Sequence, residues 1–302
     1  MRVSSNMIPN VLADLQQSQL TLNTLLQEVA SGRRVNLPSD DPAAAANMVA
    51  NQIESGNVDQ YSQNVGSALS MVQTADSALS SVVSSLTQAI SLGTQAANGT
   101  TNSTDLQTIA TQVQSLLSGV VSLANSSYSG VYLFGGTATT TKPYTADSSS
   151  STGYTYNGNN NTNSVAVGDG IGIQVNVPGS QIFSNSSTNV LGALSSLASA
   201  IQSGDKTAIS TATTNITTAL NYVSQQRVVY ANSETQLNAQ ETWLQQDKVT
   251  LVSQQNSLVG IDEATAATEL SQAETANNAA LAAAAKVLPN SLLNYLSPPT
   301  AG

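Results

Sequence analysis

The residues that could do chemistry in this sequence are few, and most of them are carboxylates. Asp40 and Asp41 stand side by side, as the two carboxylates of an acid–base site could. A helix start explains them better, because Asp41 followed by Pro42 gives an N-cap residue and a proline at the first helical position. An acid–base pair is the alternative interpretation.

Two other short motifs have similarly plain explanations. Gly32 can end a helix, and Arg33 and Arg34 would then lie beside its last carbonyl groups. A phosphate site at the two arginines is the alternative. The GDGIG sequence at 168–172 looks like a nucleotide loop, but it lies between two β-prone runs and opens no helix, so a turn is predicted.

The composition removes most catalytic chemistry. The 302 residues include no His and no Cys, which excludes imidazole bases, thiol nucleophiles, disulfides and zinc sites with nitrogen or sulfur ligands. We therefore expect a protein that is not an enzyme and that has no cofactor and no metal. A carboxylate-dependent activity on glycans is the enzymatic alternative that the composition still permits.

The charge excludes two classes of partner. Charged residues make up 9% of the chain, against roughly a quarter in an average soluble protein. The net charge of -10 repels phosphate backbones and anionic lipid headgroups. We expect no nucleic-acid partner and no membrane partner, and the first ten residues lack the pattern of a secretory signal peptide.

Long stretches of the chain repeat apolar residues in heptads. Residues 8–29 advance by steps of three and four with one polar interruption, at Ser18, and the pattern returns at 58–89 and 106–123. A further column repeats every seven residues from Ile209 to Leu258. Because an isolated helix with a narrow apolar stripe is unstable in water, these segments must bundle.

The remaining parts complete the fold prediction. Residues 130–188 are rich in Gly, Thr, Ser and Asn, with short β-prone runs that predict four to six strands. The region from 261 onward is again helical, and Pro289 is predicted to end its helix. The expected fold class is mainly α: a long antiparallel coiled-coil bundle formed by the N- and C-terminal regions, with a small central antiparallel β insertion.

The same patterns predict three domains. Residues 1–45 and 259–302 would form a terminal assembly domain, a coiled coil that we expect to be disordered in the monomer. Residues 46–129 and 189–258 would form a helical rod domain. Residues 130–188 would form a β-rich outer domain.

Both ends of the chain resemble one family. The sequence VASGRRVNLPSDDPAAAANMV at 29–49 resembles the N-terminal signature of the flagellin family, in which Ser-Gly-x-Arg-Ile/Val-Asn precedes Asp-Asp-Pro or Asp-Asp-Ala. The region from 227 to 296 is similar to the conserved C-terminal end of that family, with matches at Arg227, Asp262, Glu269 and Leu270. The central YLFGGTATTTKPY at 132–144 resembles the branch of hook-associated protein 3.

The resemblance implies a structural role. A member of this branch would be a subunit of the bacterial flagellum that joins hook and filament, secreted through the flagellar type III export channel. Its partners would be copies of itself in a helical lattice, a hook-associated protein on the hook side, flagellin on the filament side and an export chaperone at the C-terminal region. The alternative within the family is flagellin, the filament subunit.

The predicted assembly interface combines the terminal apolar seams with the matching signature residues. The seam members are Val11, Leu15, Leu22, Leu25, Val29, Leu270, Leu281 and Leu288. The signature members are Arg34, Val35, Asn36, Asp40, Asp41 and Arg227.

Overall fold

The protein folds into long helices with three small β-hairpins. The computed structural model describes residues 7–98, 102–150 and 152–296, with no account of side chains at 7–8 and 287–296. These residues divide into two compact units, a central unit of residues 58–246 and a terminal unit of residues 1–57 and 247–302. Helices α2 (Pro42–Ala97) and α6 (Lys206–Val259) contribute residues to both units.

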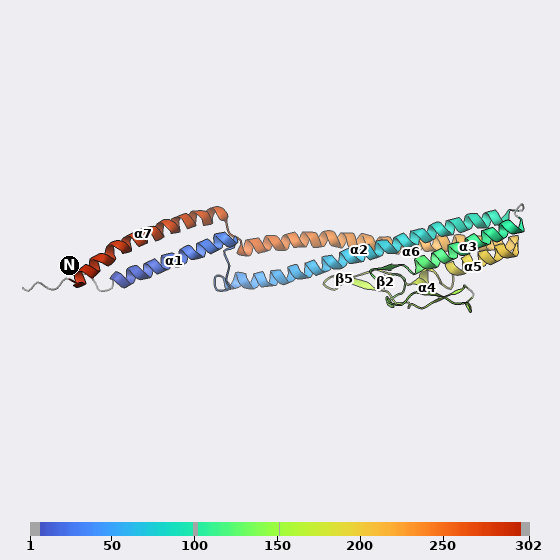
Figure 1. Ribbon diagram of the computed structural model, residues 1–302, viewed down its shortest axis with the longest axis horizontal. Coiled ribbons are helices and arrows are strands. Elements are labelled where there is room, and N and C mark those ends of the chain that lie inside the picture. Colours follow the sequence, from blue (N-terminus) through green and yellow to red (C-terminus); the bar gives the residue numbers. More distant parts are fainter. Residues whose placement is uncertain (1–6, 99–101, 151, 297–302) are drawn as a thin grey trace, which may run out of the picture. The chain divides into compact units, whose positions relative to one another are not determined.

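The central unit is a helical bundle with an apolar core. It contains α3 (Ser103–Ala124) and α5 (Val190–Ser203), which pack on each other, beside parts of α2 and α6 (Figure 1). The predicted heptad column of α6 is buried from Ile209 to Leu251. On α2, nine of the ten predicted seam positions between Val58 and Ala89 are buried, and Tyr61 is half-buried. The prediction of a bundle from heptad periodicity is confirmed.

A bidentate ion pair fixes α2 against α6 in the central unit. The Arg227 guanidinium donates from Nε to Asp76 Oδ1 at 2.8 Å and from its terminal nitrogen to Asp76 Oδ2 at 2.9 Å. Gln73 also donates to Glu234 at 2.9 Å. Glu234 lies further along α6 than Arg227, whereas its partner Gln73 lies before Asp76 on α2. The two helices therefore run antiparallel.

The β insertion consists of three separate two-stranded antiparallel sheets. They are β1 (Ser127–Tyr128) with β2 (Val131–Tyr132), β3 (Tyr144–Ala146) with β4 (Tyr154–Tyr156), and β5 (Ser164–Gly168) with β6 (Ile171–Gln174). The six strands in the described residues agree with the predicted four to six. A one-turn helix that the sequence patterns did not predict, α4 (Gly179–Ile182), follows the last hairpin.

Aromatic residues and side-chain amides tie the hairpins to the helices. Phe183 packs edge-on against Phe134 and Tyr144, at ring-centroid distances of 5.3 and 5.9 Å. Two backbone carbonyl groups of β5 accept hydrogen bonds from the helices. Asn64 of α2 donates to the Ala166 carbonyl, and Gln240 of α6 donates to the Val167 carbonyl. Paired edge groups protect a sheet from adding foreign strands.

The terminal unit pairs the two ends of the chain. Helix α1 (Met7–Ser31) lies beside α7 (Glu263–Leu296), and the predicted coiled coil between the termini is confirmed (Figure 1). The predicted helix end at Pro289 is wrong, because α7 continues to Leu296. A proline in a helix interior removes one hydrogen bond and crowds the preceding turn, a cost of about 3 kcal/mol, and the strongly helix-favouring alanines of the same helix oppose that cost.

Candidate assembly interface

Helices α1 and α7 meet along a narrow seam. On each helix, six positions with described side chains are half-buried or buried at spacings of three or four residues. They are Val11, Leu15, Ser18, Leu22, Leu25 and Glu28 on α1, and Ala266, Leu270, Ala273, Asn277, Ala280 and Ala284 on α7. The first helix thus contributes mostly Val and Leu, and the second mostly Ala, so the seam is shallow.

Most large apolar residues of α1 outside the seam face solvent. Leu12, Leu20 and Leu26 are 53%, 60% and 45% exposed, although a helix that only needed one partner would carry polar residues there. Val29 at the end of α1 and Leu281 on α7 are likewise 42% and 43% exposed. Exposed apolar area of this extent indicates an interaction surface.

The link between α1 and α2 has a defined conformation held by hydrogen bonds. Gly32 takes a left-handed conformation at φ +66°, and the Arg33 amide donates back to the Glu28 carbonyl at 3.2 Å, which is a Schellman helix end. Asp41 then caps α2 by accepting from the Ala44 amide at 3.0 Å. Both predicted helix boundaries, at Gly32 and at Asp41 with Pro42, are confirmed.

The same link is bonded to the C-terminal end of α6. The Arg34 amide donates to the Val259 carbonyl at 2.8 Å, and Val35 is buried against Val259 and Ala44. The Arg34 guanidinium donates to the Leu258 carbonyl and to Asp41, each at 3.3 Å. The segment that carries the family signature therefore connects the link between α1 and α2 to the C-terminal end of α6.

Two further signature residues shape the link itself. Asp40 accepts from the backbone amides of Asn36 and Leu37, at 3.0 and 2.7 Å. The Asn36 side chain donates to the Arg33 carbonyl at 2.9 Å. The Asp40 and Asp41 carboxylates both accept hydrogen bonds from backbone amides. This favours the predicted helix start over the alternative of an acid–base pair.

Electrostatics at this end of the seam oppose tight pairing. Partial burial and the nearby Glu269 carboxylate raise the pKa of Glu28, and Arg34 only partly offsets this. The pKa of Asp41 is lowered by its hydrogen bonds from the α2 backbone, and that of Asp262 by the same capping role at α7. The capping carboxylates are thus stabilised as anions, whereas Glu28 is destabilised as one.

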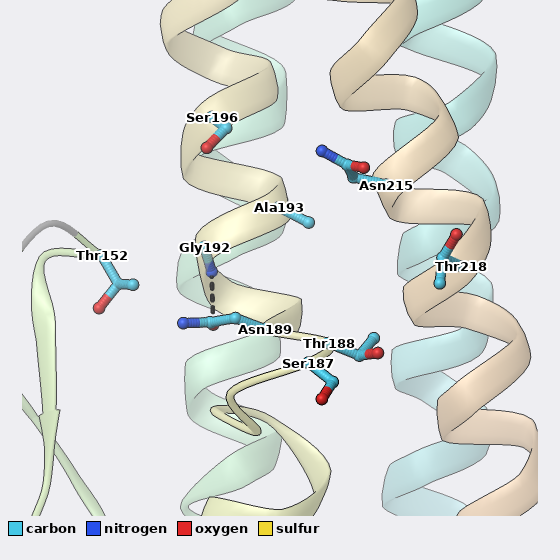
Figure 2. Close-up of a pocket in the computed structure, with 9 residues that line it drawn as sticks. All are labelled: Thr152, Ser187, Thr188, Asn189, Gly192, Ala193, Ser196, Asn215 and Thr218. Atoms are coloured by element: carbon cyan, nitrogen blue, oxygen red, sulfur yellow. Dashed lines mark hydrogen bonds between the residues drawn. The ribbon is translucent and has the colours of Figure 1, made fainter.

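One pocket of the central unit is lined entirely by uncharged side chains. This pocket of about 350 Å³ lies beside α5 and α6, and its dashed contact in Figure 2 is the Asn189 cap of α5. Its lining comprises Thr152, Ser187, Thr188, Asn189, Gly192, Ala193, Ser196, Asn215 and Thr218. Within the described ranges no group of three acidic side chains could hold a metal ion, and no helix could cross a membrane.

The structure brings most of the predicted interface residues into the terminal unit. Five lie in the seam and two are exposed beside it, at the positions given above. Five more, from Arg34 to Asp41, form the link. Arg227 lies in the central unit, on Asp76, and the Leu288 side chain lies outside the described residues. Three further seam members, Glu28, Asn277 and Ala284, were not predicted, because the first two are polar and the third is one alanine within an alanine-rich run.

Comparisons with known proteins agree with this architecture. Residues 3–139 match the family model of the bacterial flagellin N-terminal helical region. A putative flagellar hook-associated protein from Vibrio parahaemolyticus has a similar structure, with a TM-score of 0.66 and 21% identity over 73% of this chain and 100% of that one. Bacillus cereus FlgL gives a TM-score of 0.59 and 25% identity over 68% of this chain and 99% of that one.

A third structure extends the likeness. The flagellar junction protein FlgL from Legionella pneumophila gives a TM-score of 0.59 and 16% identity over 71% of this chain and all of that one. No curated protein sequence matches the chain. The match to the flagellin model thus covers the N-terminal part of the chain, and the three solved structures show that the chain shares their fold. Of these structures, one is a putative flagellar hook-associated protein and one a flagellar junction protein.

Proposed function

We propose that this protein is a structural subunit of the bacterial flagellum that joins the hook to the filament. The observation that carries the proposal is the terminal unit, whose α1 and α7 pair through a shallow seam and leave Leu12, Leu20 and Leu26 exposed. The hook-associated and junction proteins of similar fold support the place in the flagellum. The role is structural, and it needs no catalysis and no cofactor.

Polymerisation proceeds through the terminal helices of neighbouring copies. Ordering the ends of one chain costs about 1 to 2 kcal/mol per residue in backbone entropy, and a shallow seam offsets this poorly. The exposed leucines of α1 supply the missing burial when copies meet. We therefore propose that residues 1–45 and 259–302 become fully ordered only in the assembly, and that the outer hairpins at 130–188 face away from it.

A charge on an exposed leucine tests this mechanism. Leu20 is 60% exposed and lies outside the seam, so Leu20→Asp leaves the α1–α7 pairing intact. We expect it to abolish incorporation into flagella without changing the helix content of the monomer. Gln19→Asp, one residue earlier and also exposed, is the matched control and should assemble normally. Normal assembly of the Leu20 variant would show that the exposed face of α1 is not part of the assembly interface.

The place in the flagellum distinguishes the proposal from its alternative. An antibody against this chain should label isolated flagella in a narrow band between hook and filament, seen by electron microscopy. Labelling along the whole filament would instead establish that the protein is flagellin.

Export completes the proposed role. The subunit would leave the cell unfolded through the flagellar type III channel, and a chain without cysteine has no disulfide to prevent that. An export chaperone would bind the C-terminal region around residues 266–288. Truncation after Val259 should then abolish a complex with that chaperone, and an undiminished complex would contradict this assignment.

A further inference from the structure

The seam between α1 and α7 contains one polar group without a partner. The Oδ1 atom of Asn277 is buried and accepts no hydrogen bond from the described residues. Asn277 occupies a regular seam position between Ala273 and Ala280. A buried acceptor left unpaired is costly, so its presence in the middle of a coiled coil calls for an explanation.

The register of the two helices places this asparagine opposite Ser18. Near the link, Arg33 forms an antiparallel bridge with Gly260, and the Glu28 carboxylate is close enough to Glu269 to raise its pKa. Extended along antiparallel helices, these two contacts bring Asn277 level with residues 16 to 20 of α1. Ser18 is the seam residue of that stretch, and it is the polar interruption of the N-terminal heptads.

The complete seam fits the same register. Matching the six positions of each helix in antiparallel order sets the Val and Leu positions of α1 against small or apolar residues of α7. The pairs are Val11 with Ala284, Leu15 with Ala280, Ser18 with Asn277, Leu22 with Ala273, Leu25 with Leu270, and Glu28 with Ala266. Only one pair joins two uncharged polar side chains.

We propose that Asn277 and Ser18 form a polar layer that fixes the register of α1 on α7. Sliding α7 by one heptad would place Asn277 opposite Val11 or Leu25, and its amide would then be buried against a hydrocarbon side chain. The alanine positions by contrast are nearly equivalent, because Ala273 and Ala280 would accept Leu22 equally well. A single polar residue at a core position is a known means of choosing one register at a cost in stability.

Disulfide trapping tests the layer, since the chain has no cysteine of its own. Three double variants of the full chain report three registers in a glutathione buffer: Leu22→Cys with Ala273→Cys for the native one, and Leu22→Cys with Ala266→Cys or Ala280→Cys for the two shifted ones. We expect the native pair to form its disulfide about tenfold more completely than either shifted pair, because Ser18 presents a hydroxyl group to the Asn277 amide in the native register, whereas Val11 or Leu25 would present only hydrocarbon.

Replacing the asparagine should remove this preference. Asn277→Ala keeps a small residue in the seam and favours helix, and we expect the shifted pairs to rise to within about twofold of the native pair. Asn278→Ala is the matched control, because its neighbouring asparagine is exposed and gains the same helix propensity. Asn277→Ser, which retains a polar group, should preserve the native register.

Two results would overturn the proposal. One is a parent protein in which the shifted pairs form disulfides as readily as the native pair. The other is an Asn277→Ala protein whose disulfide pattern equals that of Asn278→Ala. The test does not depend on the flagellar role, because it concerns only the pairing of two helices of this chain.

Discussion

The central and terminal units are both built on heptad patterns, but the central unit buries far more apolar side chains than the terminal unit. Among the described residues, 49 apolar side chains are buried, and six of them lie in the terminal unit: Val35, Ala44, Leu251, Val259, Ala266 and Ala284. Conversely, ten of the 14 exposed large hydrophobic residues lie in that unit. The central unit has its own core, whereas the terminal unit leaves apolar surface for other molecules.

The difference comes from what stands opposite the large residues. In the central unit, Val, Leu and Ile face one another, and an aromatic cluster of Phe134, Phe183 and Tyr144 is added. In the terminal unit, four of the six seam residues of α7 are alanines. Because each buried methylene contributes about 0.8 kcal/mol, an alanine seam stabilises much less per turn. Periodicity alone therefore does not tell a self-sufficient bundle from one that needs neighbours.

The largest effect should come from the aromatic cluster. Phe183 is fully buried between Phe134 and Tyr144, and Phe183→Ala should destabilise the central unit by about 3 to 5 kcal/mol through the cavity it leaves. Thermal unfolding followed by circular dichroism measures this. Leu22→Ala in the half-buried seam should cost about 1 kcal/mol or less. Equal losses for the two variants would contradict the comparison.

A smaller effect is expected at the end of α1. Gly32 has φ +66° and open space around its Cα, so Gly32→Ala meets no clash and introduces only backbone strain of about 1 kcal/mol. Amide exchange in α1 should accelerate about fivefold while the central unit is unaffected. Gly32→Asn is the control, since asparagine tolerates this conformation. Unchanged exchange in the alanine variant would show that the helix end does not hold α1.

The smallest effect concerns pH. The pKa of Glu28 is raised in the folded chain, so its contribution to stability is full below its unfolded pKa and is lost as pH rises through its folded pKa. At pH 7, Glu28→Gln should therefore stabilise the α1–α7 pairing by a few tenths of a kcal/mol. Exchange rates of the seam amides measured between pH 4 and 7 should diverge between parent and variant as pH rises.

The Glu28 comparison has an internal check. Asp41 and Asp262 have lowered pKa values, so acid weakens their helix caps in both proteins alike. The difference between parent and variant isolates Glu28 from them. A difference that stays constant over this pH range would mean that Glu28 is not perturbed.

Much of the fold could be predicted because heptad seams and helix caps are local signals. Asp41 with Pro42 and the Gly32 helix end were readable from neighbouring residues, as was the column from Ile209 to Leu251. The extent of α7 was not, since Pro289 gives a stop signal that the helix overrides. Capping residues therefore located helix ends correctly, whereas a single proline did not.

The sequence indicated which segments form the assembly interface, but it did not indicate which residues of those segments contact one another. The family signature pointed to Arg34 and Val35, but their partners Leu258 and Val259, at the end of α6, lie more than two hundred residues away along the chain. On α7, Asn277 and Ala284 were not predicted because one is polar and the other is one alanine within an alanine-rich run. Arg227 matched the family, yet its partner Asp76 became apparent only from the packing of α2 on α6.

Amide hydrogen exchange on the soluble monomer tests most directly whether the terminal unit depends on its neighbours. We expect weak protection of α1 and α7, slow exchange for the buried segments of α2, α3, α5 and α6 in the central unit, and strong protection of α1 and α7 once the protein has polymerised. Protection of both terminal helices in the monomer equal to that of the central bundle would contradict it.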